Sequence, residues 1–522
     1  MTHTLPLPDY HAHESFGIRT KKLREIRNLG IDPYPHRYDR IRSIPALHDT
    51  YAENTPGTAE EAEAGKTERV AVAGRITLFR PMGKNAFAQI KGESGLLQVM
   101  CNRDKTTVRG LASETLSPLK FIEKKLDLGD IIGARGCLFR TRKGELTLFC
   151  EELTLLCKAL LPLPDKHSGL ADKGIAYGKR WLDLITRQES MDRFKMRSLL
   201  LSGIRRYYEK AGFIEVETPI LQNIYGGAEA RPFTSELHAL RQTMYLRIAL
   251  EISLKKLIVG GFSKVFEIGK VFRNEGIDKT HNPEFTMLES YAAYGDYHDG
   301  MTFVENLFAG LAQEIYGSTI IGNRVDRAGK EHLIDLKAPW KRLSMSEAVR
   351  TFSPHEPATM SDPEMRTALK GRVEETILRE ADRGTLLAYL FEEFAEEHLI
   401  LPHHIIDHPR AVSPLAKGCR DPQLREEGFV ERFETFILGY EFCNSYSELN
   451  DPELQRELLE KQQRRKEEGD TEASPMDEEF IEAICQGMPP TVGIGIGIDR
   501  LTMLFTGATS IRDVITFPIA RG

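Results

Sequence analysis

An arginine, several carboxylates and aromatic rings alternate along two neighbouring segments, residues 265–275 (VFEIGKVFRNE) and 284–291 (EFTMLESY). Apolar and β-favouring residues alternate in both segments, which predicts two strands. Because strand side chains point to alternate faces, the residues sharing one face are Glu267, Val271, Arg273 and Glu275 on the first, and Phe285, Met287, Glu289 and Tyr291 on the second. Paired as a hairpin, these faces would form a surface that is costly to bury without a ligand. They suit a ligand with a phosphate, a flat base and a positive charge.

Each of these residues also has an ordinary interpretation. Arg273 offers a planar guanidinium group that matches phosphate or carboxylate oxygens. The alternative is an ordinary salt bridge to Glu275 at the end of the strand. Phe285 could stack on a base or belong to the core. The segment 276–283 (GIDKTHNP) is polar and rich in turn residues, as a loop closing over a nucleotide would be. The combination favours the ligand-binding interpretation.

A second unusual pattern is GIGIGIDR at residues 493–500. Glycines two apart leave one strand face without side chains, which weakens a strand unless something approaches its backbone closely. Arg500 then falls in the first turn of a helix, a place that attracts anions. The alternative is a buried glycine-rich strand. The spacing differs from the dinucleotide-binding signature, and the sequence has no phosphate-loop motif.

Two glutamates, Glu441 and Glu448, flank the segment FCNSYS. An odd separation of seven places them on opposite faces of a regular strand, so joint metal binding requires a bulge or bend near Cys443. Carboxylates that bridge Mg²⁺ and ATP phosphates are the functional interpretation, and one buried and one solvated acid is the alternative. Glu251 lies between apolar residues, which makes a paired, buried acid plausible.

The composition indicates a multidomain globular protein. The chain has 522 residues, 41% hydrophobic and 28% charged, with a net charge of −7. Because it is acidic overall, a nucleic-acid partner would need a local basic patch. Seven cysteines without a CxxC pair indicate reduced thiols. With no signal peptide and no apolar run of about 18 residues, we expect a cytoplasmic protein without a membrane segment.

The residue pattern changes along the chain and predicts four regions. Residues 1–68 read as a helical extension and linker, with a basic helix over 19–29 that ends at Gly30. Residues 69–160 contain short strands at 70–76, 86–90, 96–100, 131–139 and 146–149, with a helical insertion over 119–126. This pattern fits a small Greek-key barrel of the OB type. Residues 161–180 form a linker, and 181–522 a mixed domain with a helix over 189–211, a strand over 213–219 and a helical insertion over about 344–400.

Taken together, these motifs resemble the bacterial class II lysyl-tRNA synthetases over roughly residues 20–520. Three ordered signatures carry the resemblance: GFIEVETP at 212–219, FRNEG with HNPEF at 272–276 and 281–285, and the glycine pattern at 493–500. Further segments of the lysine type are GGA at 226–228, RPF at 231–233 and SELN at 447–450.

The resemblance implies an α+β fold: an antiparallel-sheet catalytic domain of class II with an N-terminal OB-fold anticodon-binding domain. It implies a homodimer formed partly through the first signature, around Pro219. The implied substrates are ATP, L-lysine and tRNA(Lys), with Mg²⁺ as the cofactor. The implied activity is lysine–tRNA ligation through a lysyl-adenylate.

Carried over by position, Arg273 and Arg500 would be the catalytic residues. Arg273 would hold the α-phosphate and the lysine carboxylate, and Arg500 would cover the adenine and contact the γ-phosphate. Residues implied to bind ATP are Arg273, Glu275, His281, Asn282, Phe285, Glu441 and Arg500. Those implied to bind lysine are Gly227, Glu251, Arg273, Glu289, Tyr291, Asn444, Tyr446, Glu448 and Gly497. Glu441 and Glu448 would bind Mg²⁺.

Charge complementarity favours lysine independently of the resemblance. Desolvating an ammonium costs several kcal/mol unless carboxylates replace the water. Glu251, Glu289 and Glu448 could do so, whereas the related aspartate and asparagine enzymes need cationic or neutral partners there. In the barrel, the positions expected to read the U-rich lysine anticodon are Arg75, Phe87, Gln98 and Glu145.

The chain departs from the family pattern at two places that bear on pocket volume. It has ALEIS at 249–253 where the family commonly has APELY, and CNSY at 443–446 where many bacterial members have GNGF. Two alternative functions remain: a protein lysylase that modifies a translation factor, whose members lack the OB domain, and a non-catalytic RNA-binding paralogue. The strands over 70–156 disfavour the first, and the retained arginines and acids disfavour the second.

Overall fold

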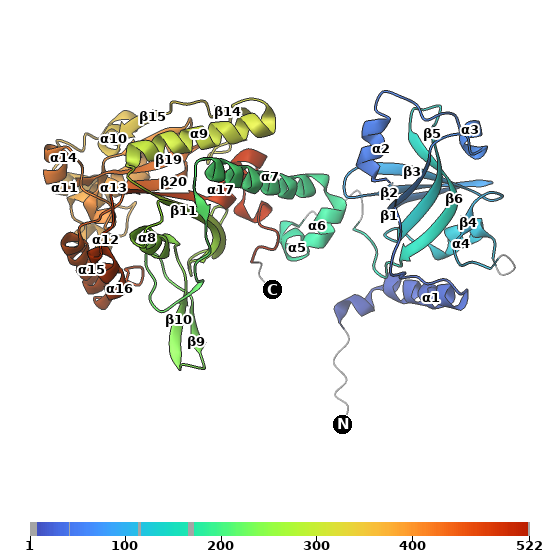
Figure 1. Ribbon diagram of the computed structural model, residues 1–522, viewed down its shortest axis with the longest axis horizontal. Coiled ribbons are helices and arrows are strands. Elements are labelled where there is room, and N and C mark those ends of the chain that lie inside the picture. The colour runs from blue at the N-terminus through green and yellow to red at the C-terminus, as the bar shows by residue number, and fades with distance from the viewer. Residues whose placement is uncertain (1–7, 41, 113–115, 165–171, 520–522) are drawn as a thin grey trace. The chain divides into compact units, whose positions relative to one another are not determined.

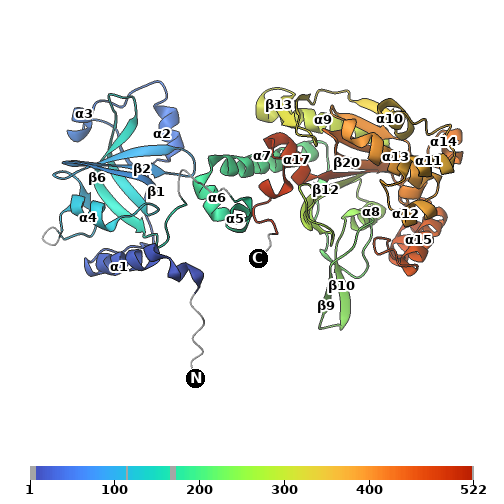
Figure 2. The same cartoon turned by 180° about the vertical axis from the view of Figure 1, so that it is seen from behind.

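The computed structural model describes residues 8–40, 42–112, 116–164 and 172–519, which form two compact units, 1–171 and 172–522 (Figures 1 and 2). The first unit contains a closed β-barrel. Its strands are β1 (Arg69–Met82), β2 (Asn85–Lys91), β3 (Leu96–Asn102), β4 (Thr107–Val108), β5 (Ile131–Arg140) and β6 (Leu146–Cys157). The order is β3-β2-β1-β5-β6-β4, and a parallel pairing of β3 with β6 closes the barrel.

The barrel is filled by alternating residues of its strands. Val72, Ile90, Val99 and Leu148 are fully buried, whereas Phe87 and its neighbours on β2 alternate between buried and half-buried positions. This alternation is the reason that the strands could be predicted from apolar spacing. The predicted barrel of the OB type is confirmed; the short strand β4 was not predicted.

Helices cover the barrel. They are α1 (Glu14–Asn28), α2 (Ile44–Thr50), α3 (Ala59–Glu63) and α4 (Pro118–Lys125), preceded by the 3₁₀ turn η1 (Asp9–Ala12). α1 begins five residues before the predicted start because the side chain of His13 accepts a hydrogen bond from Ser15 N–H and caps it. The helix ends before Gly30, whose φ of 80° favours glycine. Ile26 and Leu47 pack into the barrel core.

The second unit is built on an eight-stranded, mostly antiparallel sheet in the order β15-β16-β19-β20-β21-β12-β11-β7. Only the two outermost pairings, β15 with β16 and β11 with β7, are parallel. The strands are β7 (Ile214–Glu215), β11 (Lys264–Phe272), β12 (Glu284–Ala293), β15 (Lys341–Ser344), β16 (His403–Ile406), β19 (Arg432–Ile437), β20 (Tyr440–Ser447) and β21 (Thr491–Gly497).

The two faces of this sheet have different surroundings. On one face, Leu288 and Ile496 pack against α7 (Gln188–Lys210), α9 (Tyr297–Tyr316) and α17 (Ile498–Thr506). On the other, Val271 and Tyr291 pack against α8 (Glu251–Val259). Figures 1 and 2 place α9 and α8 on opposite sides of the sheet. Successive residues of β12 and β21 therefore alternate between a helix-covered core and the side that carries α8.

The remaining elements surround this sheet. The predicted helical insertion contains α10 (Met345–Phe352), α11 (Asp362–Leu369), α12 (Glu375–Glu380), α13 (Arg383–Phe394) and η2 (Glu396–His398). The other helices are α5 (Lys173–Gly178), α6 (Arg180–Thr186), α14 (Pro422–Glu426), α15 (Pro452–Glu467), α16 (Glu478–Cys485), η3 (Arg410–Val412) and η4 (Ile511–Asp513). The other strands are β8 (Leu221–Gln222), β9 (Thr234–Leu237), β10 (Gln242–Leu246), β13 (Ile320–Val325), β14 (Glu331–Asp335), β17 (His408–Pro409) and β18 (Phe429–Val430).

The strand predicted over residues 213–219 is much shorter in the structure. Only Ile214 and Glu215 pair with β11. The chain turns away because Thr218 gives its backbone N–H and its hydroxyl to the Glu267 carboxylate, at 3.0 and 2.7 Å, instead of continuing the ladder. Across the described ranges, no helix has the length and apolarity that a bilayer crossing needs.

Candidate active site

The predicted hairpin is present and forms one wall of a cavity. β11 and β12 pair antiparallel, with Val271 opposite Phe285 and Glu267 opposite Glu289. The cavity has a volume of about 490 Å³ and lies on the side of the sheet that carries α8. It is lined by every residue that the sequence nominated for ATP, lysine or metal binding: Gly227, Glu251, Arg273, Glu275, His281, Asn282, Phe285, Glu289, Tyr291, Glu441, Asn444, Tyr446, Glu448, Gly497 and Arg500.

Glu267 is the exception to the predicted convergence. It lies on the expected face, opposite Glu289, but its carboxylate is held by Arg247 at 2.7 Å as well as by Thr218. Arg247 also donates to the carbonyl oxygen of Lys270 at 2.8 Å. Glu267 therefore links the first signature to β11. The prediction that Glu267 contributes to the ligand-binding surface was wrong.

The glycines of β21 form the floor of the cavity. A Cβ added to Gly493 would lie 2.0 Å from Glu448 Oε1 and 2.7 Å from Tyr291 Cε1, so only glycine fits beneath these two side chains. At Gly495 the nearest atoms are 3.5 Å away, which is ordinary contact. The close-approach interpretation of this motif is thus confirmed at Gly493.

The bend required between Glu441 and Glu448 is also present. The register of β19 and β20 shifts so that Thr435 faces Cys443 while Phe436 faces Glu441. Phe442 is the extra residue of a bulge, next to Cys443, where the odd spacing predicted one. Both glutamates consequently line the same cavity.

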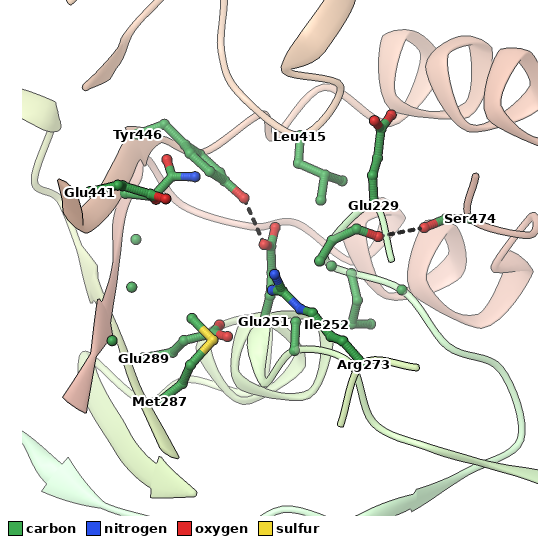
Figure 3. A pocket seen from close by; sticks show the side chains of 18 of the residues that line it. Glu229, Glu251, Ile252, Arg273, Met287, Glu289, Leu415, Glu441, Tyr446 and Ser474 are labelled. Carbon is green, nitrogen blue, oxygen red and sulfur yellow. Dashed lines mark hydrogen bonds between the residues drawn. The ribbon is translucent and has the colours of Figure 1, made fainter. Parts of the chain in front are cut away.

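One end of the cavity, the acid end, is lined by Glu251, Glu289 and Glu448, all at most 4% exposed. Tyr446 donates its hydroxyl to Glu251 Oε2 at 2.6 Å, and Tyr291 donates to Glu289 Oε2 at 3.1 Å. The N–H of Leu250 donates to Glu289 Oε1 at 2.9 Å. Figure 3 shows Glu251, Glu289 and Tyr446 directed into the same space as Arg273.

The acid end holds more negative than positive charge. Burial raises the pKa of Glu289 to about 7, and the neighbouring Glu251 adds to the effect. Burial also raises the pKa of Glu448 well above its usual range, although Lys255 opposes the rise. Oε1 of Glu448 is buried and has no hydrogen-bond partner among the described residues. These acids are arranged to receive a cation.

Two guanidinium groups also line the cavity, and Arg273 interacts electrostatically with both Glu289 and Arg500. Arg273 lies over the Phe285 ring at 5.3 Å from its centroid and donates to the Ile248 carbonyl oxygen at 3.3 Å. Arg500 donates to the Glu441 carbonyl oxygen at 2.9 Å and contacts His281 Nε2 at 3.2 Å. Asn282 is buried, with its amide donating to Glu284 O at 2.6 Å, while its Oδ1 finds no partner in the part of the chain that the structure describes. A buried free acceptor suits an amino group of a base.

The comparisons with known proteins agree with this geometry. Residues 172–521 match the family described as tRNA synthetases class II (D, K and N), and residues 70–156 match the OB-fold nucleic acid binding domain. The lysine–tRNA ligase of Chlamydia caviae is 53% identical over 518 residues, which cover 98% of each chain. That of Enterococcus faecalis is 45% identical over 505 residues, covering 97% of each.

The chain belongs to the lysine–tRNA ligase family. Within this class II synthetase, three cavity or cavity-adjacent residues were missed by the sequence reasoning. Lys255 follows Glu251 by four residues on α8, a spacing that could have identified an ion pair. Arg432 and Glu434 lie on β19, and alternation along that strand puts both on the cavity side. Glu434 neighbours Glu441, whose pKa is raised by burial and then by Glu434.

Three of the four nominated anticodon residues of the synthetase lie close together on the barrel. Phe87 is half-buried on β2, and Gln98 on the adjacent β3 donates to Thr147 Oγ1 at 3.0 Å. Thr147 in turn donates to the Glu145 carbonyl oxygen at 3.2 Å. Arg75 lies on β1, where its guanidinium donates to Gly129 O at 2.7 Å.

We expect Gly493→Ala to lower the free energy of unfolding by about 1–3 kcal/mol, because the added methyl group overlaps Glu448. Gly495→Ala is the matched control on the same strand and should remain within about 1 kcal/mol of the unaltered protein. Urea denaturation measures both. Equal losses in the two variants would contradict the close packing at Gly493.

We expect Glu289→Gln to stabilise the ligand-free protein at pH 8 by up to about 3 kcal/mol. The pKa of Glu289 is raised from 4.5 to about 7 on folding, so stability is lost as pH rises through this range. At pH 5 the carboxyl is protonated in the folded protein and the advantage of glutamine should largely disappear. Thermal or urea unfolding at the two pH values measures the difference.

Glu284→Gln provides the control, since Glu284 begins the same strand and is about half exposed. Its effect should stay below about 0.5 kcal/mol at both pH values. A stabilisation by Glu289→Gln that did not depend on pH would rule out titration of this carboxyl as its cause.

Proposed function

We propose that this chain joins L-lysine to tRNA(Lys) in an ATP-dependent reaction through a lysyl-adenylate. The observation that carries the proposal is one cavity lined by three buried acids and by two guanidinium groups. Lysine carries two ammonium groups, a carboxylate and an apolar chain, and ATP carries a triphosphate and a flat base. The ammonium groups match the acids in charge, and the carboxylate and triphosphate match the guanidinium groups.

In the first step the lysine carboxylate attacks the α-phosphorus in line, the bond to the bridging oxygen breaks, and pyrophosphate leaves. Arg273 is positioned between the acid end and the phosphates, so it can hold both the carboxylate and the α-phosphate. Arg500 stabilises the departing pyrophosphate. In the second step the 3′-hydroxyl of the terminal tRNA adenosine attacks the lysyl carbonyl, and AMP leaves. Positioning and fixed positive charge supply the catalysis, without a covalent intermediate on the protein.

The remaining residues orient the two substrates. Asn282, through its free Oδ1, accepts from the adenine amino group, which Glu275 also faces, and Phe285 stacks on the ring. Gly227 has a φ of 86° and packs its Cα side against Glu251, where the α-amino group of lysine would bind. The lysine side chain is enclosed by the other residues of the acid end and by Asn444 and Tyr446 on β20.

The acids of this cavity fit Mg²⁺, which binds through one or two carboxylates together with substrate phosphates. Glu441 is buried beside Glu434, and Glu448 has a free buried oxygen as judged from the described residues. We assign Glu441 and Glu448 as ligands, with Glu434 as an additional acid next to Glu441. When bound, the ion would neutralise charge on the phosphates. Within the described ranges, no group of three or more His, Cys, Asp or Glu side chains is arranged to hold a metal ion.

The barrel would hold the anticodon, with Phe87 stacked on a base and Gln98, Glu145 and Arg75 around it. Such stacking is worth about 1–3 kcal/mol per base. The protein lysylase alternative has no use for this barrel, which spans Arg69–Cys157. We assign the barrel to residues 69–160 and the catalytic domain to residues 181–522.

A homodimer completes the proposal. The segment around the first signature exposes apolar side chains that a partner subunit would bury: Ile214 at 53%, Ile220 at 42% and Leu221 at 50%. The same patch on both subunits would form an isologous interface. A cytoplasmic location accords with tRNA charging and with seven cysteines in the free thiol form.

Arg273→Ala should abolish lysine-dependent ATP–pyrophosphate exchange, with a loss of at least about a hundredfold, because Arg273 is the cation assigned to both the lysine carboxylate and the α-phosphate. The exchange assay, run with all amino acids, also tests lysine as the substrate. The control is Arg350→Ala, which removes an exposed arginine of α10 and should leave exchange unchanged. Near-normal exchange by Arg273→Ala would contradict the assigned role.

Phe87→Ala should reduce lysylation of tRNA(Lys) by about tenfold or more while sparing exchange, since stacking on the anticodon affects only the step that uses tRNA. Leu161→Ala removes an exposed side chain of the same unit and serves as the control. Equal loss of both steps in Phe87→Ala would argue against an anticodon role.

A further inference from the structure

A fully buried lysine lies among the acids of the cavity. Lys255 is on α8, one turn after Glu251, and is 0% exposed. Its ammonium forms ion pairs with Glu251 Oε1 and with Glu448 Oε2. The rings of Tyr446 and Phe480 lie 5.5 and 5.7 Å from the ammonium nitrogen. None of the steps above uses this residue.

The ion pairs of Lys255 divide the oxygens of the two carboxylates. On Glu251, Oε1 pairs with Lys255 and Oε2 accepts from Tyr446. On Glu448, Oε2 pairs with Lys255, while Oε1 lies against Gly493 and lacks a hydrogen-bond donor within the described ranges. Lys255 therefore pairs with one oxygen of each acid, and on Glu448 it leaves Oε1 for a ligand.

A charge count explains why one internal cation suits this site. The acid end contains three carboxylates, from Glu251, Glu289 and Glu448, and one ammonium, from Lys255. Buried charge must be balanced, and two negative charges remain after Lys255 is counted. The two ammonium groups of a diamino acid are attracted to this remaining negative charge, part of which Glu448 shares with the Mg²⁺ assigned above.

We propose that Lys255 is a positioning and specificity-determining residue, which orients Glu251 and Glu448 and sets the charge of the acid end to match a diamino acid. The inference rests on the proposed function and deepens it. Lys255 acts through the two glutamates and does not touch the reacting atoms. Without it, Glu251 and Glu448 lose the ion pairs that hold their carboxylates in place. Their oxygens then no longer keep the positions at which an ammonium of the substrate would bind.

The first test is Lys255→Met, which keeps the length of the side chain and removes its charge. In ATP–pyrophosphate exchange at pH 7 we expect KM for lysine to rise about tenfold or more. KM for lysine should rise more than KM for ATP, because Glu251, which is assigned to lysine alone, loses its cation as well as Glu448. The two KM values, measured in the same preparation, decide this point.

Lys256→Met is the matched control. Lys256 is the next residue of α8, faces outward and pairs with the exposed Glu479 at 2.8 Å. Its replacement should leave both KM values unchanged. A normal lysine KM in a folded Lys255→Met protein would overturn the inference without affecting the proposed function. The proposed function fails separately, if the unaltered protein lacks lysine-dependent exchange.

Chemical rescue separates a charge role from a packing role. Lys255→Ala leaves a space in which ethylammonium can replace the lost cation. We expect millimolar ethylammonium to lower the lysine KM of Lys255→Ala and to leave unchanged or raise that of the unaltered protein, in which it can only compete with lysine. Absence of rescue in a folded variant would overturn the proposal. So would failure of both variants to fold with and without ethylammonium, which would assign Lys255 to the core; circular dichroism monitors folding.

Discussion

Three carboxylates are buried together at one end of the cavity, and the free-energy cost of burying negative charge constrains everything around them. Glu251, Glu289 and Glu448 are each almost inaccessible to water. Hydrogen bonds from Tyr446, Tyr291 and the Leu250 N–H, together with Lys255, offset part of this cost. The part of this free-energy cost that is not offset raises the pKa of Glu289. The site is therefore held in a state that a cationic ligand stabilises.

The surrounding fold serves this arrangement. One face of the sheet is anchored by a large apolar core under α7, α9 and α17, so the other face can carry charged groups. Gly493 lets β21 pass beneath Glu448, and the bulge at Phe442 brings Glu441 to the same cavity. α8 presents Glu251 and Lys255 from one helical turn. The backbone of each element therefore determines where its charged side chain lies in the cavity.

The charges that line the cavity also limit which amino acids it can bind. A negatively charged amino acid would meet buried carboxylates, and a neutral one would leave them uncompensated. Arg273 and Arg500 line the same cavity as these acids, so the carboxylate of a bound diamino acid is attracted to the guanidinium groups. Substrate selection and orientation thus arise from the same charge separation.

The sequence by itself determined the local features of this protein. Alternation of apolar residues predicted β11, β12 and the barrel strands, because successive side chains of a strand point to opposite faces, and the buried face is apolar. The odd spacing of Glu441 and Glu448 required a bulge, and the glycines of β21 indicated a close approach, since both conclusions depend only on local geometry. Every residue that the resemblance nominated for ATP, lysine or metal binding lines the cavity, although Arg432 and Glu434 were not among them.

Only the tertiary structure decided which charges meet. Glu267 and Glu289 lie opposite each other on paired strands. The carboxylate of Glu267 accepts hydrogen bonds from Arg247 and Thr218, whereas that of Glu289 faces the cavity. Lys255 could be placed near Glu251 from helical spacing, but its contact with Glu448 joins residues 193 positions apart in the sequence. The physical reason is that the balance of buried charge depends on partners from distant elements, which packing alone brings together.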